Sequence, residues 1–418
     1  MRRLDLLASI QGLPRDLQLL FWSFFLWTFG LGLYNYVWPL FLEQLHASPS
    51  QVGLVFSIGF IAIAVTLIPG GILANRYELR TLLIIGWIMS IPVPLMYYFA
   101  RIWTDVIPGI ILLQASGFNI PAFNAYIVGA GEKAKIASNF GIIWAAAPLG
   151  IVFSPAVGSA LLTLLTIRDL FLLSFIFFTI STIVLFFIKR QPPLEKDARA
   201  SKLEVPKSIP EATLLVYLAV AGIALDIASP FLPLYFHDIL SLQPSLIQLL
   251  GAAQSLGGAT FAILLSKRAD KASRGKTMAL GLLISTCGII GIILTGNPLF
   301  AFPLVFLFGS ARAPSLIGYS ILANIRQGAS RAGQYGFYLT LESLGFVAGS
   351  YLGGMLYTIN PAIGFYTTAV SFLALALVAA LTNFQAKRAP AADSQDGKEF
   401  KAPQGDLKEL LVLVEWQY

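Results

Sequence analysis

Residues 141–158 read GIIWAAAPLGIVFSPAVG, an apolar stretch with glycines at 141, 150 and 158 and prolines at 148 and 155. Glycine and proline are the residues least suited to a helix in water, so their presence inside an apolar run needs a reason. In a bilayer, small residues let a second helix approach closely, and neighbouring helices satisfy the backbone groups that a proline frees. The stretch therefore predicts a bent, closely packed membrane-spanning helix.

The composition of the whole chain also predicts a bilayer environment. Of its 418 residues, 57% are hydrophobic and 12% are charged, and the mean hydropathy is +0.76. Polar groups are too few to cover that apolar surface in water. Apolar stretches of about 20 residues predict an all-α multi-pass membrane protein with twelve transmembrane helices. The expected spans are 17–42, 50–74, 81–100, 104–128, 138–163, 168–189, 212–236, 244–266, 276–296, 298–325, 333–357 and 361–384.

The lysines and arginines predict the orientation of these spans. If the N-terminus is cytoplasmic, all of the 28 basic residues except Arg101, Arg168 and Arg312 lie on the cytoplasmic side. Basic residues collect on that side of membrane proteins, so we expect a multi-pass protein of the cell membrane with both termini in the cytoplasm. The same placement argues against nucleic-acid binding, despite a net charge of +7.

Residue types suited to metal, redox or nucleotide chemistry are scarce. The chain has one cysteine, Cys287, and two histidines, His46 and His237, which excludes a disulfide framework and histidine-rich or cysteine-based metal sites. It has no Walker loop and no Rossmann fingerprint, so an ATP-driven pump is not expected. We therefore expect no enzyme activity, no cofactor and no metal.

The chain is an internal duplication with an offset of about 195 residues. Ala74-Asn75-Arg76 corresponds to Ala269-Asp270-Lys271. The small residues of span five have small counterparts in span eleven: Gly141, Gly150, Ser154 and Gly158 correspond to Gly336, Gly345, Gly349 and Gly353. An even number of spans per copy gives both copies the same orientation, which predicts parallel repeats. The expected domains are a six-helix bundle at 1–190, a cytoplasmic linker at 191–211, a second bundle at 212–384 and a cytoplasmic tail at 385–418.

The segment between spans two and three resembles a signature of the major facilitator superfamily, G-x-L-A-D-R-x-G-R-K. This chain reads GILANRYELR at 71–80, with an asparagine in place of the acidic residue, and RADKASRGK at 268–276 in the second copy. The resemblance covers residues 15–385 and implies a charged latch between helices at the cytoplasmic face. Its residues would be Gly71, Asn75, Arg76, Arg80, Asp270 and Lys271. A cation there also meets the negative C-terminal end of a helix dipole, and ordinary positive-inside charge is the alternative.

Span five resembles a pattern of the same family's proton-coupled drug antiporters, G-(x8)-G-(x3)-G-P-(x2)-G-G. Gly141, Gly150, Ser154, Pro155 and Gly158 follow this spacing, with serine in place of some glycines. Together with Gly345, Gly349 and Gly353 of span eleven, they are expected to serve helix packing and hinging where the halves meet. Generic helix packing is the alternative to an antiporter signature.

Three ionisable side chains lie within spans: Asp226, Arg312 and Glu342. A charge near the bilayer centre costs at least about 2.5–3.5 kcal/mol, so each needs a partner or a watery cavity. Rise per residue puts Arg312 roughly 20 Å from the outer side and Glu342 roughly 10 Å from the inner side, which is the same depth in a core about 30 Å thick. We expect these two to pair and the carboxylates to carry a proton. A static ion pair, with Asp226 capping a helix break, is the alternative.

Neutral polar side chains in other spans are candidates for a substrate cavity. They are Asn35, Gln114, Asn119, Asn124, Trp144 and Gln254. Such groups also hydrogen-bond between helices without facing a pathway. The aromatic residues near span ends, Trp38, Tyr97, Tyr98 and Trp103, are expected in the interfacial belt rather than around a ligand.

These patterns predict a secondary transporter that works by alternating access of two bundles. The favoured activity is proton-coupled, multidrug-type efflux of amphipathic small molecules by a monomer in the lipid bilayer. One alternative is uptake or exchange of a small organic anion bound by Arg312. Another is a membrane sensor that keeps the fold without transporting.

Overall fold

The computed structural model describes residues 6–131, 135–193, 208–295, 297–325 and 330–382, and only the backbone of 6–8, 137, 210, 270, 323–325 and 330–338. A short helix, α1 (Leu6–Gln11), precedes the first span. The first six spans are α2 with α3 (Arg15–Gly32, Trp38–Gln44), α4 (Pro49–Ala74), α5 with α6 (Leu79–Ser90, Pro92–Phe99), α7 with α8 (Ile107–Ala115, Ile120–Ala130), α9 with α10 (Ile136–Trp144, Ala146–Leu161) and α11 (Ile167–Leu185).

The second half repeats this arrangement. Its spans are α12 with α13 (Ile209–Ala228, Leu232–Asp238), α14 (Pro244–Lys271), α15 (Arg274–Thr295), α16 with α17 (Pro298–Phe308, Ala313–Ile325), α18 (Ser330–Ile359) and α19 (Pro361–Leu381). Among the described residues, eleven helices are long and apolar enough to cross a bilayer. The predicted span at 333–357 lies within α18, a helix of 30 residues. The predicted all-helical, twelve-span fold is confirmed.

Four spans are broken near their middle by a turn of 3-10 helix, at 35–37, 116–119, 229–231 and 309–312. The breaks are η1, η3, η5 and η6. Each ends two residues before a proline: Pro39, Pro121, Pro233 and Pro314. Because proline has no backbone N–H, it cannot bond the carbonyl four residues earlier, which lies inside each break. The first and third breaks are 194 residues apart and the second and fourth 193, as the duplication predicts.

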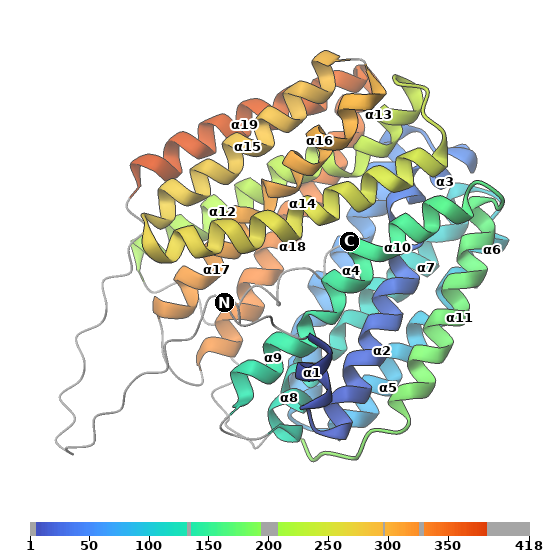
Figure 1. Cartoon of the computed structure of the whole chain (residues 1–418), viewed down its shortest axis with the longest axis vertical. Helices are drawn as coiled ribbons and strands as arrows, with labels where there is room; N and C mark the ends of the chain where they lie inside the picture. The colour runs from blue at the N-terminus through green and yellow to red at the C-terminus, as the bar shows by residue number, and fades with distance from the viewer. Residues whose placement is uncertain (1–5, 132–134, 194–207, 296, 326–329, 383–418) are drawn as a thin grey trace.

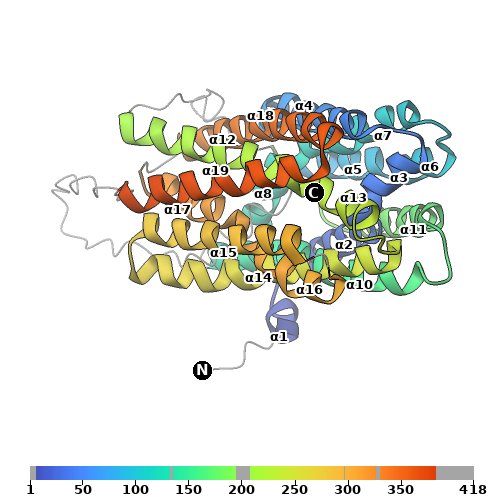
Figure 2. The ribbon, with the colours of Figure 1, turned by 90° about the horizontal axis from the view of Figure 1, so that it is seen from above.

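The two halves meet at one end of the molecule and diverge at the other (Figure 1). We call the end with the loops at 45–48, 162–166, 239–243 and 360 the far face, and the end with the loops at 75–78 and 272–273 the linker face. Seen from above, the halves lie side by side (Figure 2). Contacts between them run along two helix pairs, α4 with α18 and α10 with α14.

Side-chain caps fix several helix starts at the far face. Ser48 and Thr166 accept hydrogen bonds from the backbone N–H groups three residues later, and Asn297 and Asn360 from those two residues later. Such caps satisfy donors that the first turn of a helix leaves free. On the helix flanks, large apolar side chains such as Val65, Val370 and Leu377 are more than half exposed. This surface suits contact with lipid tails.

Candidate functional site

A central cavity of about 130 Å³ lies between the two halves. Three of the four breaks line it, η1, η5 and η6, together with parts of α2, α4, α10, α12 and α14. Non-helical backbone at membrane depth is tolerated where it lines a cavity, and such sites hold ligands in broken-helix transporters. Most of the wall is apolar, and Arg312 is the charged side chain among its lining residues.

Three of the predicted cavity and charge residues line this space, and a fourth lines a pocket beside it. Asn35 and Gln254 line the central cavity with Arg312, and Gln114 lines a smaller pocket that adjoins it. The side-chain oxygen of Gln254 is buried and has no hydrogen-bond partner among the described residues. A buried unsatisfied amide oxygen is costly, so a donor from a ligand would be favoured at this position.

Three other predicted cavity residues, Asn119, Asn124 and Trp144, are not among the residues that line these two spaces, and their role in a cavity stays a prediction. The indole N–H of Trp144 donates to Oδ1 of Asn124 at 3.1 Å, so these two satisfy each other within the first half. Asn119 is buried and lies against Gly86 of α5. A helix turns by about 100° per residue, so polarity alone does not show which face of a helix lines the cavity.

Glu342 lies in α18 and is buried. Its carboxylate accepts hydrogen bonds from the hydroxyls of Ser315, at 2.7 Å, and of Tyr319. Arg312 lies within electrostatic range of it. The carboxylate thus has two hydroxyl partners on α17, and its pairing with Arg312 stays a prediction.

Asp226 lies in α12 and is also buried. The hydroxyl of Ser350 in α18 donates to its carboxylate. Asp226 is not among the residues that line the central cavity, although Arg312 and Glu342 lie within electrostatic range. Both intramembrane carboxylates therefore contact α18 or lie on it, behind the cavity wall.

The three hydroxyl groups that bind these carboxylates were not predicted. Ser315 and Tyr319 are four residues apart, so they share one face of α17. That spacing was a visible signal in the sequence. Ser350 occupies the position that corresponds to the proline of span five, and only packing reveals its contact.

The expected interfacial location of two aromatic residues is wrong. Trp38 and Tyr97 are 3% and 1% exposed, whereas Tyr98 and Trp103 are half-buried. Trp38 begins α3 just after the break in span one, and its side chain is buried in the bundle. The two rings line the pocket that adjoins the central cavity.

Close backbone contacts join the halves near the far face. Gly53 of α4 lies against Gly354 and the Ser350 carbonyl of α18. The hydroxyls of Ser50 and Thr358 hydrogen-bond at 2.8 Å, one turn farther toward the same face. Any side chain larger than hydrogen at the two glycines would separate the helices.

The pair α10 and α14 makes a similar contact. The side-chain N–H groups of Gln248 in α14 donate to the carbonyls of Gly32 and Leu33, at 2.9 and 2.8 Å. These carbonyls lie at the break in span one, where no later helical N–H reaches them. Gly158 lies beside Gln248 and the Leu33 carbonyl. One side chain of the second half thus caps a broken helix of the first.

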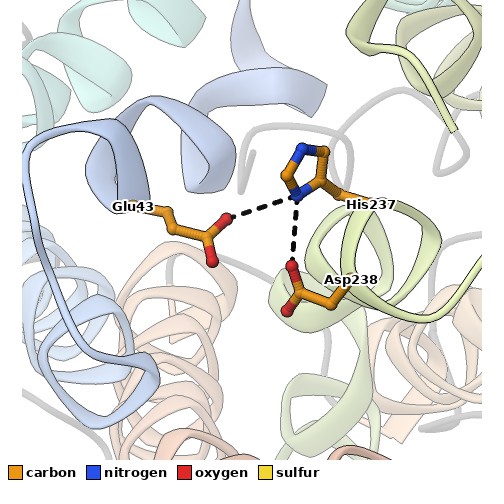
Figure 3. A group of neighbouring side chains, drawn as sticks. All are labelled: Glu43, His237 and Asp238. Carbon is orange, nitrogen blue, oxygen red and sulfur yellow. Dashed lines mark hydrogen bonds and ion pairs between the residues drawn. The ribbon is translucent and has the colours of Figure 1, made fainter. Parts of the chain in front are cut away.

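A charged cluster also bridges the halves at the far face (Figure 3). Nδ1 of His237 lies 3.7 Å from Glu43 and 3.1 Å from Asp238. The hydroxyl of Tyr357 donates to the other oxygen of Asp238 at 2.8 Å. The side-chain nitrogen and oxygen atoms of these three residues that could coordinate a metal ion lie within 4.8 Å of one another (Figure 3). Exposed acidic groups commonly gather in this way without binding an ion. The cluster adds to the contacts that close this face.

Most of the predicted helix-packing residues lie against a helix of their own half, whereas Gly158 also contacts the other half. Gly150 lies against Thr28 of α2, and Ser154 lies against Gly32. In the second half, a Cβ at Gly349 would lie 2.6 Å from the Ile223 carbonyl oxygen of α12. The remaining predicted packing residues are Gly345 and Gly353, which lie against α12, Pro155, which lines the cavity, and Gly141, which faces open space.

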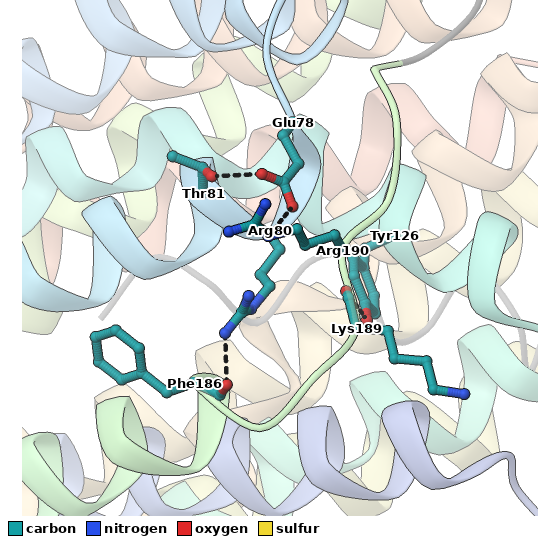
Figure 4. Close-up of polar contacts among 7 residues, drawn as sticks. All are labelled: Glu78, Arg80, Thr81, Tyr126, Phe186, Lys189 and Arg190. Carbon is teal, nitrogen blue, oxygen red and sulfur yellow. Dashed lines mark hydrogen bonds and ion pairs between the residues drawn. The ribbon is translucent and has the colours of Figure 1, made fainter.

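The first-half latch motif holds the end of span six (Figure 4). Nη2 of Arg80 donates to the carbonyl of Phe186 at 2.5 Å, just after α11 ends. Glu78 pairs with Arg190 at 3.8 Å and accepts a hydrogen bond from Thr81. The cation therefore meets the negative end of a helix, and the loop is tied to its own half.

The other latch positions show fewer contacts. Arg76 is exposed, Asn75 ends α4, and an added Cβ at Gly71 would meet open space. Lys271 is exposed in the last turn of α14, and the side chain of Asp270 lies outside the described residues. The role of these residues in a latch stays a prediction.

Sequence comparison finds a family that matches almost the whole chain. The Major Facilitator Superfamily profile matches residues 20–219 and again 212–415, once for each half. Two curated relatives are 25% identical: the uncharacterized MFS-type transporter YfiS of Bacillus subtilis, over 154 residues, and MJ1560 of Methanocaldococcus jannaschii, over 137 residues. The matches cover 37% and 32% of this chain, and about a third of each relative, 37% and 34%.

Solved structures share the fold. The nucleoside transporter NupG aligns with a TM-score of 0.70 and 15% identity over 87% of this chain and 98% of its own. A bacterial homolog of the human lysosomal transporter Spinster, in an inward-facing and occupied conformation, aligns with a TM-score of 0.70 and 17% identity over 90% and 98%. At such identities the likeness concerns the fold alone.

Proposed function

Because the chain belongs to the major facilitator superfamily and is a membrane transporter rather than an enzyme, we propose that it carries an amphipathic organic anion across the membrane together with a proton. Transport would proceed by alternating access, with the linker face cytoplasmic. The structure then corresponds to a state closed at the far face.

The composition of the cavity wall supports an anionic, amphipathic substrate. Apolar side chains suit the body of such a molecule, and Arg312 suits its carboxylate, sulfonate or phosphate. A lipophilic cation would instead meet the positive charge of Arg312, while both carboxylates lie behind the wall. This single observation favours the organic-anion alternative over efflux of cationic drugs.

Proton coupling follows from the position of Glu342. Its carboxylate and a substrate anion would both be stabilised by Arg312, so each weakens the attraction available to the other. Protonation of Glu342 therefore favours anion binding, and the anion favours the proton. By linkage, the two ligands bind together, which predicts symport. Ser315 and Tyr319 keep hydrogen bonds to the acid in either state.

The experiment is transport of 2-naphthoate by the purified protein in liposomes. We expect an acidic outside to drive accumulation with net proton entry. Arg312→Gln should weaken 2-naphthoate binding about 10- to 100-fold, the contribution of a charge-assisted hydrogen bond. Lys267→Gln, which removes an exposed cation outside the cavity, is the matched control. Unchanged affinity in Arg312→Gln contradicts the proposal.

A second candidate is proton-driven export, which the glycine pattern of span five supports through its resemblance to antiporters. The sign of the proton flux separates the two candidates. Symport moves protons in the direction of 2-naphthoate, and antiport moves them in the opposite direction. Movement of tetraphenylphosphonium against its gradient, without 2-naphthoate transport, favours the antiporter.

A further inference from the structure

A second pocket extends from the central cavity into the first half of the chain. Its volume is about 50 Å³, and it shares Leu31, Asn35, Phe56 and Ile151 with the central cavity. Because these four residues line both spaces, the two spaces adjoin. We call this second space the aromatic pocket.

The walls of the aromatic pocket consist largely of rings. The ring centroids of Trp38 and Tyr97 are 5.5 Å apart, and those of Trp38 and Phe56 are 5.2 Å apart in an edge-to-face arrangement. Tyr34 and Tyr97 also meet edge to face, at 6.2 Å. Rings held against one another in this way keep fixed orientations, so they offer a preformed surface to a planar group.

Three polar atoms of these rings lack a hydrogen-bond partner among the described residues. They are the hydroxyls of Tyr34 and Tyr97 and the indole nitrogen of Trp38, in side chains at most 3% exposed. Buried polar groups in proteins are almost always bonded. The nearby indole of Trp27 follows that rule, since it donates to Ser90 at 2.8 Å. Three exceptions in one pocket indicate a ligand that supplies the partners.

The chemistry of the three atoms restricts that ligand. An indole N–H donates only, and a phenol hydroxyl donates readily, so the ligand must present acceptors. No charged side chain is among the residues that line the aromatic pocket. A net charge on the ligand would be desolvated there without compensation. The occupant is therefore uncharged.

We propose that the aromatic pocket binds a planar, uncharged ring of the substrate that carries a hydrogen-bond acceptor. This inference rests on the proposed function, because the anionic group of the same molecule then lies at Arg312 in the adjoining cavity. The transported class is accordingly aromatic acids with an ether, carbonyl or ring-nitrogen acceptor remote from the acid group.

The test compares 6-methoxy-2-naphthoate with 6-ethyl-2-naphthoate, which has a similar shape but no acceptor. Binding to the full-length protein in lipid nanodiscs is measured by titration calorimetry. We expect the wild type to bind the methoxy compound roughly 5-fold more tightly, as one net hydrogen bond predicts. Tyr34→Phe, Tyr97→Phe and Trp38→Phe each remove one donor, and at least one of them should abolish the preference without weakening the ethyl compound.

Tyr126→Phe is the matched control, because it removes a buried hydroxyl of the same half that bonds the Lys189 carbonyl outside the pocket. Its preference should equal that of the wild type. Equal binding of both compounds to the wild type, with both weakened by Arg312→Gln, overturns this inference and leaves the proposed function standing. If all three pocket variants still bind the methoxy compound more tightly than the ethyl compound, this inference is overturned as well. Failure of the wild type to bind either naphthoate overturns both proposals.

Discussion

Gly354→Ala is expected to shift the protein toward a state open at the far face. An added Cβ would lie 2.6 Å from the carbonyl oxygen of Pro49 and 3.0 Å from the Cα of Ser50. Both atoms belong to the backbone of α4, so no side-chain rotation can relieve the contact. The two helices must separate by roughly an ångström instead, because ordinary contacts lie about 3.5–4 Å apart.

The size of the shift follows from the cost of overpacking. One extra methyl group in a well-packed contact costs about 1–3 kcal/mol. Gly354 and Pro49 belong to different halves, so this cost falls on the conformation in which the far face is closed. A difference of that size changes the ratio of the two conformations by about 5- to 150-fold.

Distances between spin labels measure this ratio. Tyr77→Cys and Lys271→Cys place one label on each half at exposed positions of the linker face, in a Cys287→Ser background. As the far face opens, the linker face closes, so the population of short distances should grow. Gly141→Ala is the control, because a Cβ there meets open space.

An unchanged distance distribution in Gly354→Ala would refute this reasoning. If thermal stability also stayed unchanged, the α4–α18 contact would not be tight. If stability fell with no change in distances, the contact would persist in both conformations, and the closed far face would not be one of two alternating states.

Three further predictions concern charged groups. Glu342→Gln should abolish accumulation of 2-naphthoate driven by a pH gradient yet keep exchange at equal pH, because the amide mimics the protonated acid; pH-driven accumulation at the wild-type rate would exclude Glu342 as the proton carrier. Arg80→Gln should lower the free energy of unfolding by about 1–2 kcal/mol, through loss of the bond to the Phe186 carbonyl, and an unchanged melting temperature would contradict this. His237→Gln removes a partly exposed contact with Glu43 between the halves. The same spin-label distances should therefore report a change of at most about 5-fold in the ratio of the two conformations, equivalent to about 1 kcal/mol.

The amino-acid sequence by itself determined the spans and the repeat. The length of an apolar stretch depends only on residues that are adjacent in the chain. A stretch of about 20 such residues can cross a bilayer whatever its later packing partners are. The duplicated glycines and the motifs at 71–80 and 268–276 can likewise be recognised in the sequence, whatever the orientation of the helices that carry them. The breaks in spans one, four, seven and ten are also local features, because each is made by a proline that removes a hydrogen bond from its own helix.

Only the tertiary structure decided which side chains share a space. Asn124 and Trp144 belong to different spans, and only the rotation of their helices decides that they hydrogen-bond each other. Trp38 and Tyr97 look interfacial, but the break in span one and the packing of the first bundle bury them beside the cavity. Rotation about a helix axis is set by contacts between segments far apart in the chain, and a shift of one residue turns a side chain by about 100°. Local sequence therefore predicts the helices of this transporter, and long-range packing determines its site.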